Sequence, residues 1–167
     1  MRDKVLIIDD AQFNREMLAE MLEDEYTILF AEDGQKGIEM LEAYKDEICV
    51  ILLDLVMPVM NGYDVMEIMK KRGYMDCIPV LVISGEQASD VERKCFDCGA
   101  TDFIRKPFCG SRITMRVKNA IDLFQYRNST EAQRKSYIKD TLIGILDHHS
   151  EDAETMKNEI QKLIEML

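Results

Sequence analysis

Five short apolar runs, each followed by a segment of helical period, constrain most strongly what this chain can fold into. The runs occupy residues 5–8, 26–31, 48–53, 80–83 and 101–104. After each run, apolar residues recur every three or four positions, as they do in an amphipathic helix. Strands that alternate with helices predict βαβ units and a parallel sheet. Because the runs are almost continuously apolar, we expect helices to cover both faces of that sheet.

The connections between these runs restrict the order in which the strands can lie. Parallel strands that are joined through helices cross over in the right-handed sense, which leaves few topologies. We expect a doubly wound α/β sheet with its five parallel strands in the order 2-1-3-4-5. Ligands of such a sheet bind beyond the carboxyl ends of the strands, where the order reverses between strands 1 and 3. Side chains that directly follow strands are therefore the candidate site residues.

Three aspartates follow the first and third apolar runs. Asp9 and Asp10 come directly after residues 5–8, and Asp54 comes directly after residues 48–53. If strands 1 and 3 are neighbours, these carboxylates converge at one edge of the sheet, where like charges disfavour ionisation. Mg²⁺ would compensate that charge, because it prefers carboxylate, water and phosphate oxygens. The sequence predicts a Mg²⁺ site here, and the simpler alternative is a set of ordinary loop aspartates.

Two further strand ends carry polar side chains. Ser84 follows residues 80–83, and Lys106 follows residues 101–104 after one intervening residue. A hydroxyl and an ammonium group at the same edge could bind the oxygens of a phosphoryl group and supply positive charge for its transfer. Taken singly, Ser84 is a common helix cap and Lys106 a solvated loop residue. Their position beside the acidic residues makes them candidates.

Together these motifs resemble the receiver domain of two-component response regulators. The resemblance extends over residues 3–126 and implies a flavodoxin-like fold. It is carried by four motifs in order, which are Asp9-Asp10, Asp54-Leu-Val-Met-Pro58 followed by Asn61-Gly62, Ser84-Gly85, and Lys106-Pro107-Phe108.

The resemblance also implies a phosphoacceptor and its cation. Asp54 would accept a phosphoryl group from the phosphohistidine of a sensor histidine kinase or a phosphotransfer protein. Asp10 would ligate Mg²⁺ directly and Asp9 mostly through water, and the backbone carbonyl of Val56 would complete the protein ligands together with Asp54. The apolar side chain of Val56 cannot orient an attacking water, so we expect a phosphorylated lifetime that is not among the shortest. Glu86 is the other residue expected to influence water access.

The same resemblance assigns the phosphoryl contacts and a switch. Lys106 would pair with the phosphoryl group, and Ser84 would bind one of its oxygens. Phe103 would turn into the space that Ser84 vacates, although a simple core phenylalanine explains this residue almost equally well. The output surface would comprise helix 4, strand 5 and helix 5, within residues 86–126. The Lys106–Pro107 bond would be cis.

Residues 127–167 are expected to form a helical extension beyond the receiver domain, which we place at residues 1–126. Ser150, followed by two acidic residues, is typical of a helix start. Either a continuous coiled coil that pairs with a second copy, or a helical hairpin with a polar turn at residues 148–150, would bury the apolar seams. The two seams are out of register by four residues and consist of Ile138, Leu142, Ile145 and His149, then Ala153, Met156, Ile160, Leu163 and Leu167.

Composition argues against nucleic acids and membranes as partners. Asp and Glu number 32 against 21 Lys and Arg, a formal net charge of −11, which argues against direct nucleic-acid binding. No apolar run approaches the roughly 18 residues of a membrane span, and the N-terminus lacks a secretory signal, so we expect a cytoplasmic protein. Cys95 and Cys98 form a CxxC pair without a second Cys or His pair nearby, so we interpret them as packing residues rather than zinc ligands.

The preferred hypothesis is a phosphorylation-controlled switch with a helical tail that dimerises or docks on a partner. Its only catalysis would be phosphorylation of itself and slow autodephosphorylation. The alternative is that the chain is the receiver part of a larger regulator with an enzymatic output, such as cyclic-dinucleotide synthesis or hydrolysis. A Mg²⁺-dependent aspartyl phosphatase is a weaker alternative, because such enzymes usually carry an Asp-x-Asp pattern after the first strand. A third and weaker alternative is a receiver-like scaffold that never accepts a phosphoryl group.

Overall fold

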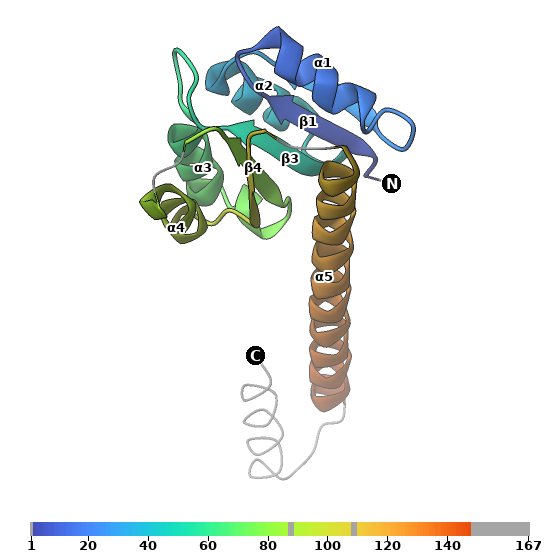
Figure 1. Ribbon diagram of the computed structural model, residues 1–167. Coiled ribbons are helices and arrows are strands. Elements are labelled where there is room, and N and C mark those ends of the chain that lie inside the picture. Colours follow the sequence, from blue (N-terminus) through green and yellow to red (C-terminus); the bar gives the residue numbers. More distant parts are fainter. Residues whose placement is uncertain (1, 87–88, 108–109, 148–167) are drawn as a thin grey trace. The chain divides into compact units, whose positions relative to one another are not determined.

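The computed structural model describes residues 2–86, 89–107 and 110–147, and its strands and helices alternate as the sequence predicts (Figure 1). The strands are β1 (Lys4–Ile8), β2 (Thr27–Ala31), β3 (Ile48–Asp54), β4 (Val80–Ser84) and β5 (Asp102–Arg105). The helices are α1 (Gln12–Glu20), α2 (Gly34–Tyr44), α3 (Gly62–Lys71), α4 (Ser89–Cys98) and α5 (Gly110–Asp147), with a short 3₁₀ turn, η1 (Tyr74–Asp76).

The strands form one parallel sheet in the order β2-β1-β3-β4-β5. The predicted fold class, a doubly wound flavodoxin-like sheet, is therefore confirmed. Ile8 at the end of β1 pairs with Leu53 near the end of β3. Because the two strands run in the same direction, the residues that follow Ile8 and Leu53 meet at one edge of the sheet.

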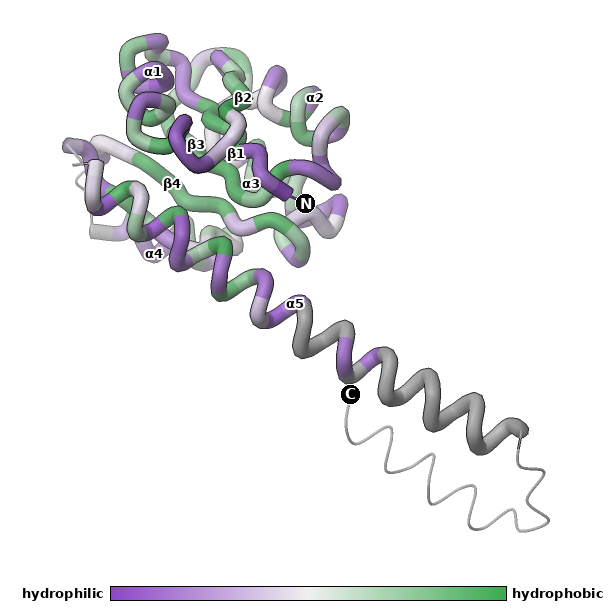
Figure 2. The backbone as a smooth tube through the Cα atoms, turned by 90° about the vertical axis from the view of Figure 1, so that its right-hand side faces the viewer, coloured by the Kyte–Doolittle hydropathy of each residue, from purple (hydrophilic) through white to green (hydrophobic). Residues whose placement is uncertain are grey.

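The sheet is covered on both faces, as its apolar strands require. Successive residues of a strand point to opposite faces. Leu6 and Ile8 pack in a core with residues of α2, α3 and α4, whereas Val5 and Ile7 pack in a second core with residues of α1 and α5. All seven residues of β3, at the centre of the sheet, are buried. In Figure 2 the strand β4, next to β3, is accordingly coloured as hydrophobic along most of its length.

Two candidate residues belong to strands rather than following them. Asp54 is the last residue of β3 and pairs with Ile83. Ser84 is the last residue of β4 and pairs with Arg105. The backbone ladder continues one residue past each apolar run, because a polar side chain at the rim does not interrupt main-chain pairing. The positions of Asp54 and Ser84 are thus set by the sheet itself.

The helix that packs against the sheet at residues 113–121 continues past residue 126, the expected boundary between the receiver domain and its helical extension. Ile113, Val117 and Ile121 are buried against the sheet, and α5 ends only at Asp147. The chain divides into two units, Met1–Phe124 and Gln125–Leu167. Among the described residues, none of the helices is long and apolar enough to pass through a membrane.

The expected turn at residues 148–150 and the second apolar seam, within residues 153–167, lie outside the described residues. The choice between a continuous coiled coil and a helical hairpin therefore stays a prediction.

Candidate functional site

Within the part of the chain that the structure describes, three polar side chains are buried, and all three lie at the carboxyl edge of the sheet. They are Asp9, Asp54 and Ser84, with exposed fractions of 2%, 7% and 1%. Burying a polar or charged group costs free energy unless it is hydrogen-bonded or paired with an opposite charge. The partners of these side chains therefore define the site.

Lys106 joins the two buried carboxylates. Its Nζ atom lies 2.8 Å from Oδ2 of Asp9 and 2.8 Å from Oδ1 of Asp54. Lys106 is thus the cation of a buried cluster with two negative charges and one positive charge. The cluster keeps an excess negative charge, which a bound cation would offset.

The electrostatics of the cluster reflect this imbalance. Burial raises the pKa of Asp54, and the hydrogen bonds from Lys106 and from the backbone N–H of Val56 draw it down without reversing the shift. Burial lowers the pKa of Lys106, but its hydrogen bonds to Asp54 and Asp9 outweigh that effect and leave the pKa above its ordinary value. Lys106 is therefore a stable ammonium group, whereas Asp54 is only partly compensated.

Asp9 is held by α1 as well as by Lys106. Its Oδ1 accepts hydrogen bonds from the backbone N–H of Ala11 at 2.9 Å and from Nδ2 of Asn14 at 3.0 Å. The same Nδ2 atom lies 3.1 Å from Oδ2 of Asp9. The guanidinium of Arg15 donates to the backbone carbonyls of Asp9 at 2.6 Å and of Asp10 at 3.1 Å.

Asn14 and Arg15 are site residues that the sequence analysis did not identify. Both lie on α1, whose first turn begins close to the carboxyl end of β1. A signal was available in principle, because the helix that follows a strand in a doubly wound sheet starts beside the ligand edge. Neither residue directly follows a strand, however, and only the turn at residues 9–11 fixes which helical side chains face the acidic pair.

The structure brings two of the three expected carboxylates together. Asp10, unlike Asp9, has an exposed side chain at the rim. In the described part of the chain, no three Asp, Glu, His or Cys residues form a group that could hold a metal ion. Asp9 and Asp10 are consecutive residues after the end of β1, and only Asp9 is buried.

Val56 and Ser84 flank Asp54. The backbone N–H of Val56 donates to Oδ2 of Asp54 at 3.1 Å, and the Val56 side chain is 62% exposed. Oγ of Ser84 accepts a hydrogen bond from the N–H of Glu86 at 3.2 Å, and the Ser84 carbonyl accepts from the N–H of Lys106 at 2.9 Å. The ends of β4 and β5 are thus tied together beside Asp54.

Phe103 is buried, with 6% of its surface exposed, in the core that also contains residues of α2, α3 and α4. This arrangement agrees with a core phenylalanine, and its movement in a switch stays a prediction. The expected cis bond between Lys106 and Pro107 is present. Cys95 is buried and Cys98 is half-buried on α4, as expected for packing residues.

The loop between β3 and α3 is shaped by close packing. A side-chain carbon at Gly62 would lie 2.4 Å from the carbonyl oxygen of Asp54, so only glycine fits there. Oδ1 of Asn61 accepts hydrogen bonds from the N–H groups of Tyr63 and Asp64 and caps α3. The Asn61-Gly62 motif therefore fixes the chain immediately behind Asp54.

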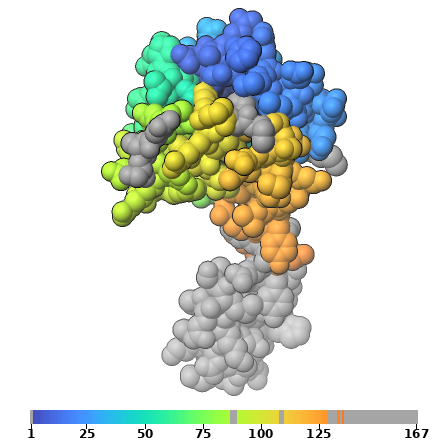
Figure 3. Space-filling view, in the orientation of Figure 1, coloured from blue at the N-terminus to red at the C-terminus, as the bar shows by residue number. Residues whose placement is uncertain are grey.

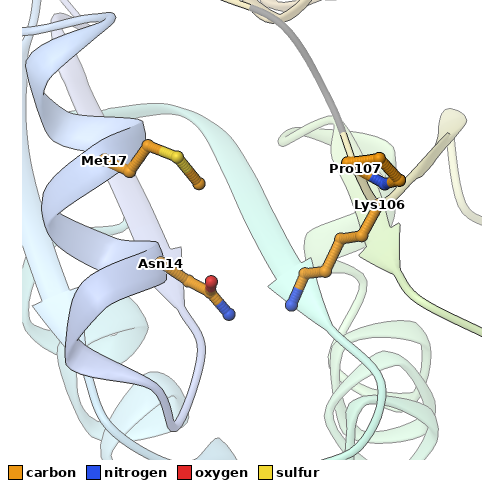
Figure 4. Close-up of a pocket in the computed structure, with 4 residues that line it drawn as sticks. All are labelled: Asn14, Met17, Lys106 and Pro107. Atoms are coloured by element: carbon orange, nitrogen blue, oxygen red, sulfur yellow. The ribbon is translucent and has the colours of Figure 1, made fainter.

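A pocket of about 410 Å³ opens beside Lys106. It is lined by Asn14 and Met17 from α1 and by Lys106 and Pro107 from the segment after β5. Figure 4 shows the side chains of Asn14 and Lys106 pointing toward each other from the two walls.

The sequence model of the family described as "Response regulator receiver domain" matches residues 5–118 of the chain. The chain belongs to this family. Receiver domains generally bind Mg²⁺ at their phosphorylation site and interact with histidine kinases or phosphotransfer proteins. The function expected from the motifs, a receiver domain of two-component response regulators, is confirmed.

Curated relatives of this receiver domain are longer proteins. A cyclic di-GMP phosphodiesterase of Thermotoga maritima is 30% identical over 129 residues, which cover 75% of this chain and 33% of the relative. A response regulator of Streptococcus pneumoniae is 34% identical over 135 residues, which cover 75% of this chain and 59% of the relative. The chain thus spans between a third and three fifths of the length of these two proteins.

Solved structures of receiver domains share the fold. The chemotaxis protein CheY4 of Vibrio cholerae is 26% identical, with a TM-score of 0.65 over 72% of this chain and 99% of the other. The CheX–CheY complex of Borrelia burgdorferi, solved with BeF₃ and Mg²⁺, is 27% identical, with a TM-score of 0.65 over 70% of this chain and 87% of the other.

Proposed function

We propose that this receiver domain accepts a phosphoryl group on Asp54 from the phosphohistidine of a sensor histidine kinase or a phosphotransfer protein. The observation that carries the proposal is the buried position of Asp54 at the end of β3, with the Lys106 ammonium 2.8 Å from its Oδ1 atom. A carboxylate held beside a fixed cation can act as a nucleophile toward phosphorus, because the cation offsets the charge that both reactants carry.

In the transfer, an oxygen of Asp54 forms a bond to phosphorus while the P–N bond to the imidazole breaks. The product is an acyl phosphate on Asp54 and a histidine freed from its phosphoryl group. The protein contributes mainly position and charge, since phosphoryl transfer requires little other chemistry from side chains. Lys106 would turn from the carboxylates toward the phosphoryl oxygens, and Ser84 would donate its hydroxyl hydrogen to another of them.

The oxygen donors at this edge of the sheet suit a Mg²⁺ ion in their chemistry, although the side chain of Asp10 is exposed at the rim rather than gathered with Asp9 and Asp54. Asp9, Asp10, Asp54 and the backbone carbonyl of Val56 would offer only oxygen ligands, the kind that Mg²⁺ prefers. The excess negative charge of the buried cluster favours a cation. When bound, Mg²⁺ would offset the charge on the phosphoryl oxygens. Asp9, saturated by hydrogen bonds, fits the expected contact through water better than a direct one.

Hydrolysis of the acyl phosphate would end the signal. One of the exposed side chains next to the site belongs to Val56, which is apolar and cannot hold a water by hydrogen bonding. We therefore expect the phosphorylated state to persist longer than in receivers with an amide or acid at this position.

The switch would act on the surface of α4, β5 and the start of α5. Figure 3 shows these segments adjoining on one face, in yellow-green to orange. Salt bridges already link them, from Arg105 of β5 to Glu92 of α4 at 3.0 Å and from Arg116 of α5 to Asp102 of β5 at 2.6 Å. If Ser84 moves toward a phosphoryl group, its Oγ atom loses the hydrogen bond from the N–H of Glu86, a residue shortly before α4 in the chain.

Residues 127–167 are proposed to form the helical extension that dimerises or docks on a partner. Within a larger protein, the receiver would control an output domain. The relative from Thermotoga maritima, a cyclic di-GMP phosphodiesterase of which this chain covers 33%, is consistent with a cyclic-dinucleotide enzyme as that domain.

Intact-mass measurement after incubation with acetyl phosphate and Mg²⁺ tests the proposal. The wild type should gain one phosphoryl group, and Asp54→Asn should gain none. A phosphatase would instead turn over small phosphomonoesters without retaining the group, and a scaffold would stay unmodified in both forms.

A further inference from the structure

We propose that Asn14 is a positioning residue for the phosphoryl transfer that the proposed function assigns to Asp54. Its side-chain amide holds the Asp9 carboxylate in place while Lys106 moves from that carboxylate to the phosphoryl group.

The contacts of Asn14 fit a residue that orients a carboxylate. Nδ2 of Asn14 lies 3.0 Å from Oδ1 and 3.1 Å from Oδ2 of Asp9. A donor that reaches both oxygens fixes the rotation of the carboxylate as well as its place. Asp9 is 2% exposed, so solvent offers little to replace such a donor.

Lys106 cannot supply this support throughout the reaction. Its ammonium is shared between Asp9 and Asp54, at 2.8 Å from each. A phosphoryl group on Asp54 brings oxygens that compete for the same ammonium. When Lys106 turns toward them, Oδ2 of Asp9 loses its charged donor, and a buried carboxylate that lacks a donor is costly. Asn14 and the N–H of Ala11, which belong to α1 and the turn before it, remain.

Arg15 complements Asn14 on the main chain. Its guanidinium donates to the carbonyls of both Asp9 and Asp10. Two consecutive residues of α1 thus anchor the acidic pair, Asn14 through a side chain and Arg15 through the backbone. Neither anchor involves Asp54, so both persist when Asp54 is modified.

Lys106 has room to make the move. Asn14 and Lys106 line the same pocket of about 410 Å³, and their side chains face each other across it (Figure 4). The Lys106 side chain is 23% exposed. Open space therefore adjoins the Lys106 side chain on the side of Asn14, so neighbouring atoms do not enclose it there.

Nuclear magnetic resonance of the side-chain amides tests this role directly. The probe is beryllofluoride with Mg²⁺, a phosphoryl mimic, added to ¹⁵N-labelled protein. Gln12 is the matched internal control, because its amide donates to the exposed carboxylate of Glu16 on the same helix. We expect the amide protons of Asn14 to exchange slowly before and after saturation, and those of Gln12 to exchange fast in both states. Asn14 protons that exchange as fast as those of Gln12 after saturation would overturn the proposal.

A pair of variants supplies the second measurement. Asn14→Leu removes the donor, and Gln12→Leu makes the same change where no site residue is touched. With acetyl phosphate and saturating Mg²⁺, Asn14→Leu should be phosphorylated about tenfold more slowly than the wild type, as the loss of a buried hydrogen bond predicts. Gln12→Leu should keep the wild-type rate. Equal rates for Asn14→Leu and the wild type would contradict the proposal.

These experiments distinguish an error in the role of Asn14 from an error in the role of Asp54. If Asp54 is not a phosphoacceptor, the wild type carries no phosphoryl group at position 54 and does not bind beryllofluoride there, which overturns both proposals. If only the role of Asn14 is wrong, the wild type is phosphorylated normally and Asn14→Leu matches it. Thermal unfolding of both variants shows whether Asn14→Leu remains folded at the temperature of the assay.

Discussion

Nζ of Lys106 lies 2.8 Å from Oδ1 of Asp54, although the two residues are separated by 52 positions in the chain. The same ammonium lies 2.8 Å from Oδ2 of Asp9. One cation therefore serves two buried carboxylates, and any reaction that adds negative charge at Asp54 must redistribute its contacts. The stability of the site and its chemistry depend on the same three side chains.

Asp54→Asn should stabilise the protein. The substitution leaves one carboxylate, Asp9, paired with Lys106, and the excess negative charge disappears. We expect the free energy of unfolding at pH 7 without Mg²⁺ to rise by about 1 kcal/mol. Urea unfolding measures it, and the gain should shrink when Mg²⁺ is added. Asp46→Asn, the same change at an exposed position, serves as the control and should have no effect.

The gain from Asp54→Asn should depend on pH. Burial holds the pKa of Asp54 above its ordinary value in the folded protein, so the folded state retains its proton to higher pH than the unfolded state does. The wild type therefore loses stability as the pH rises through the window between these two values. Asp54→Asn has no carboxyl group at position 54 and does not lose stability in this way. The free energies of unfolding of the two proteins should therefore become equal at pH values below this window. A difference that is constant across pH would show that Asp54 is not responsible.

Much of this site could be predicted because the sheet places it. Asp9, Asp54, Ser84 and Lys106 stand at or next to strand ends, and strand order alone brings those ends together. The sharing of Lys106 between Asp9 and Asp54 could not be predicted, because it depends on side-chain directions at the rim. The same holds for Asp10. Its position after the first strand was predicted, but the exposure of its side chain was not.

Contacts that depend on the conformation of a turn could not be predicted from the sequence either. Asn14 and Arg15 reach Asp9 only because of the turn at residues 9–11, and nothing in their spacing from a strand indicates that turn. The helical period after residue 126 does predict a helix, and α5 continues to Asp147. A continuous coiled coil and a hairpin with its turn at residues 148–150 share this helix, so its presence does not decide between them.

Val56→Asn should shorten the phosphorylated lifetime. An amide at this exposed position beside Asp54 can hold a water near the acyl phosphate, which the valine side chain cannot do. We expect the first-order decay of the phosphorylated protein, followed by intact mass, to accelerate roughly tenfold, which is less than a positioned general base contributes, because an amide can orient a water but cannot take its proton. An unchanged decay rate would show that position 56 does not control access of water.

Val59→Asn should stabilise the fold. Val59 has a φ of 66°, in the left-handed region that a β-branched side chain rarely occupies, and its side chain is 86% exposed. Asparagine tolerates this conformation better, so we expect the free energy of unfolding to increase by about 1 kcal/mol. Val56→Asn is the matched control for stability, since Val56 is also exposed but does not have a positive φ. If both variants had the same stability, strain at Val59 would be excluded.

Gly62→Ala should damage both stability and phosphorylation. The added carbon would lie 2.4 Å from the Asp54 carbonyl oxygen and 2.9 Å from Cα of Leu55. Backbone must move to admit it, at a cost of about 3 kcal/mol, and Asp54 moves with it. Gly85→Ala is the control, because its added carbon finds its nearest neighbour, Cβ of Lys106, at 4.0 Å. Chemical unfolding of both variants should show a loss for Gly62→Ala only.

The most direct test of Asp54 is chemical trapping of the acyl phosphate. The protein is incubated with acetyl phosphate and Mg²⁺, reduced with borohydride, digested and sequenced by mass spectrometry. Reduction converts a phosphorylated aspartate to homoserine, and we predict homoserine at position 54 alone. Homoserine at position 9 or 10, or at no position, would contradict the assignment of Asp54 as the phosphoacceptor.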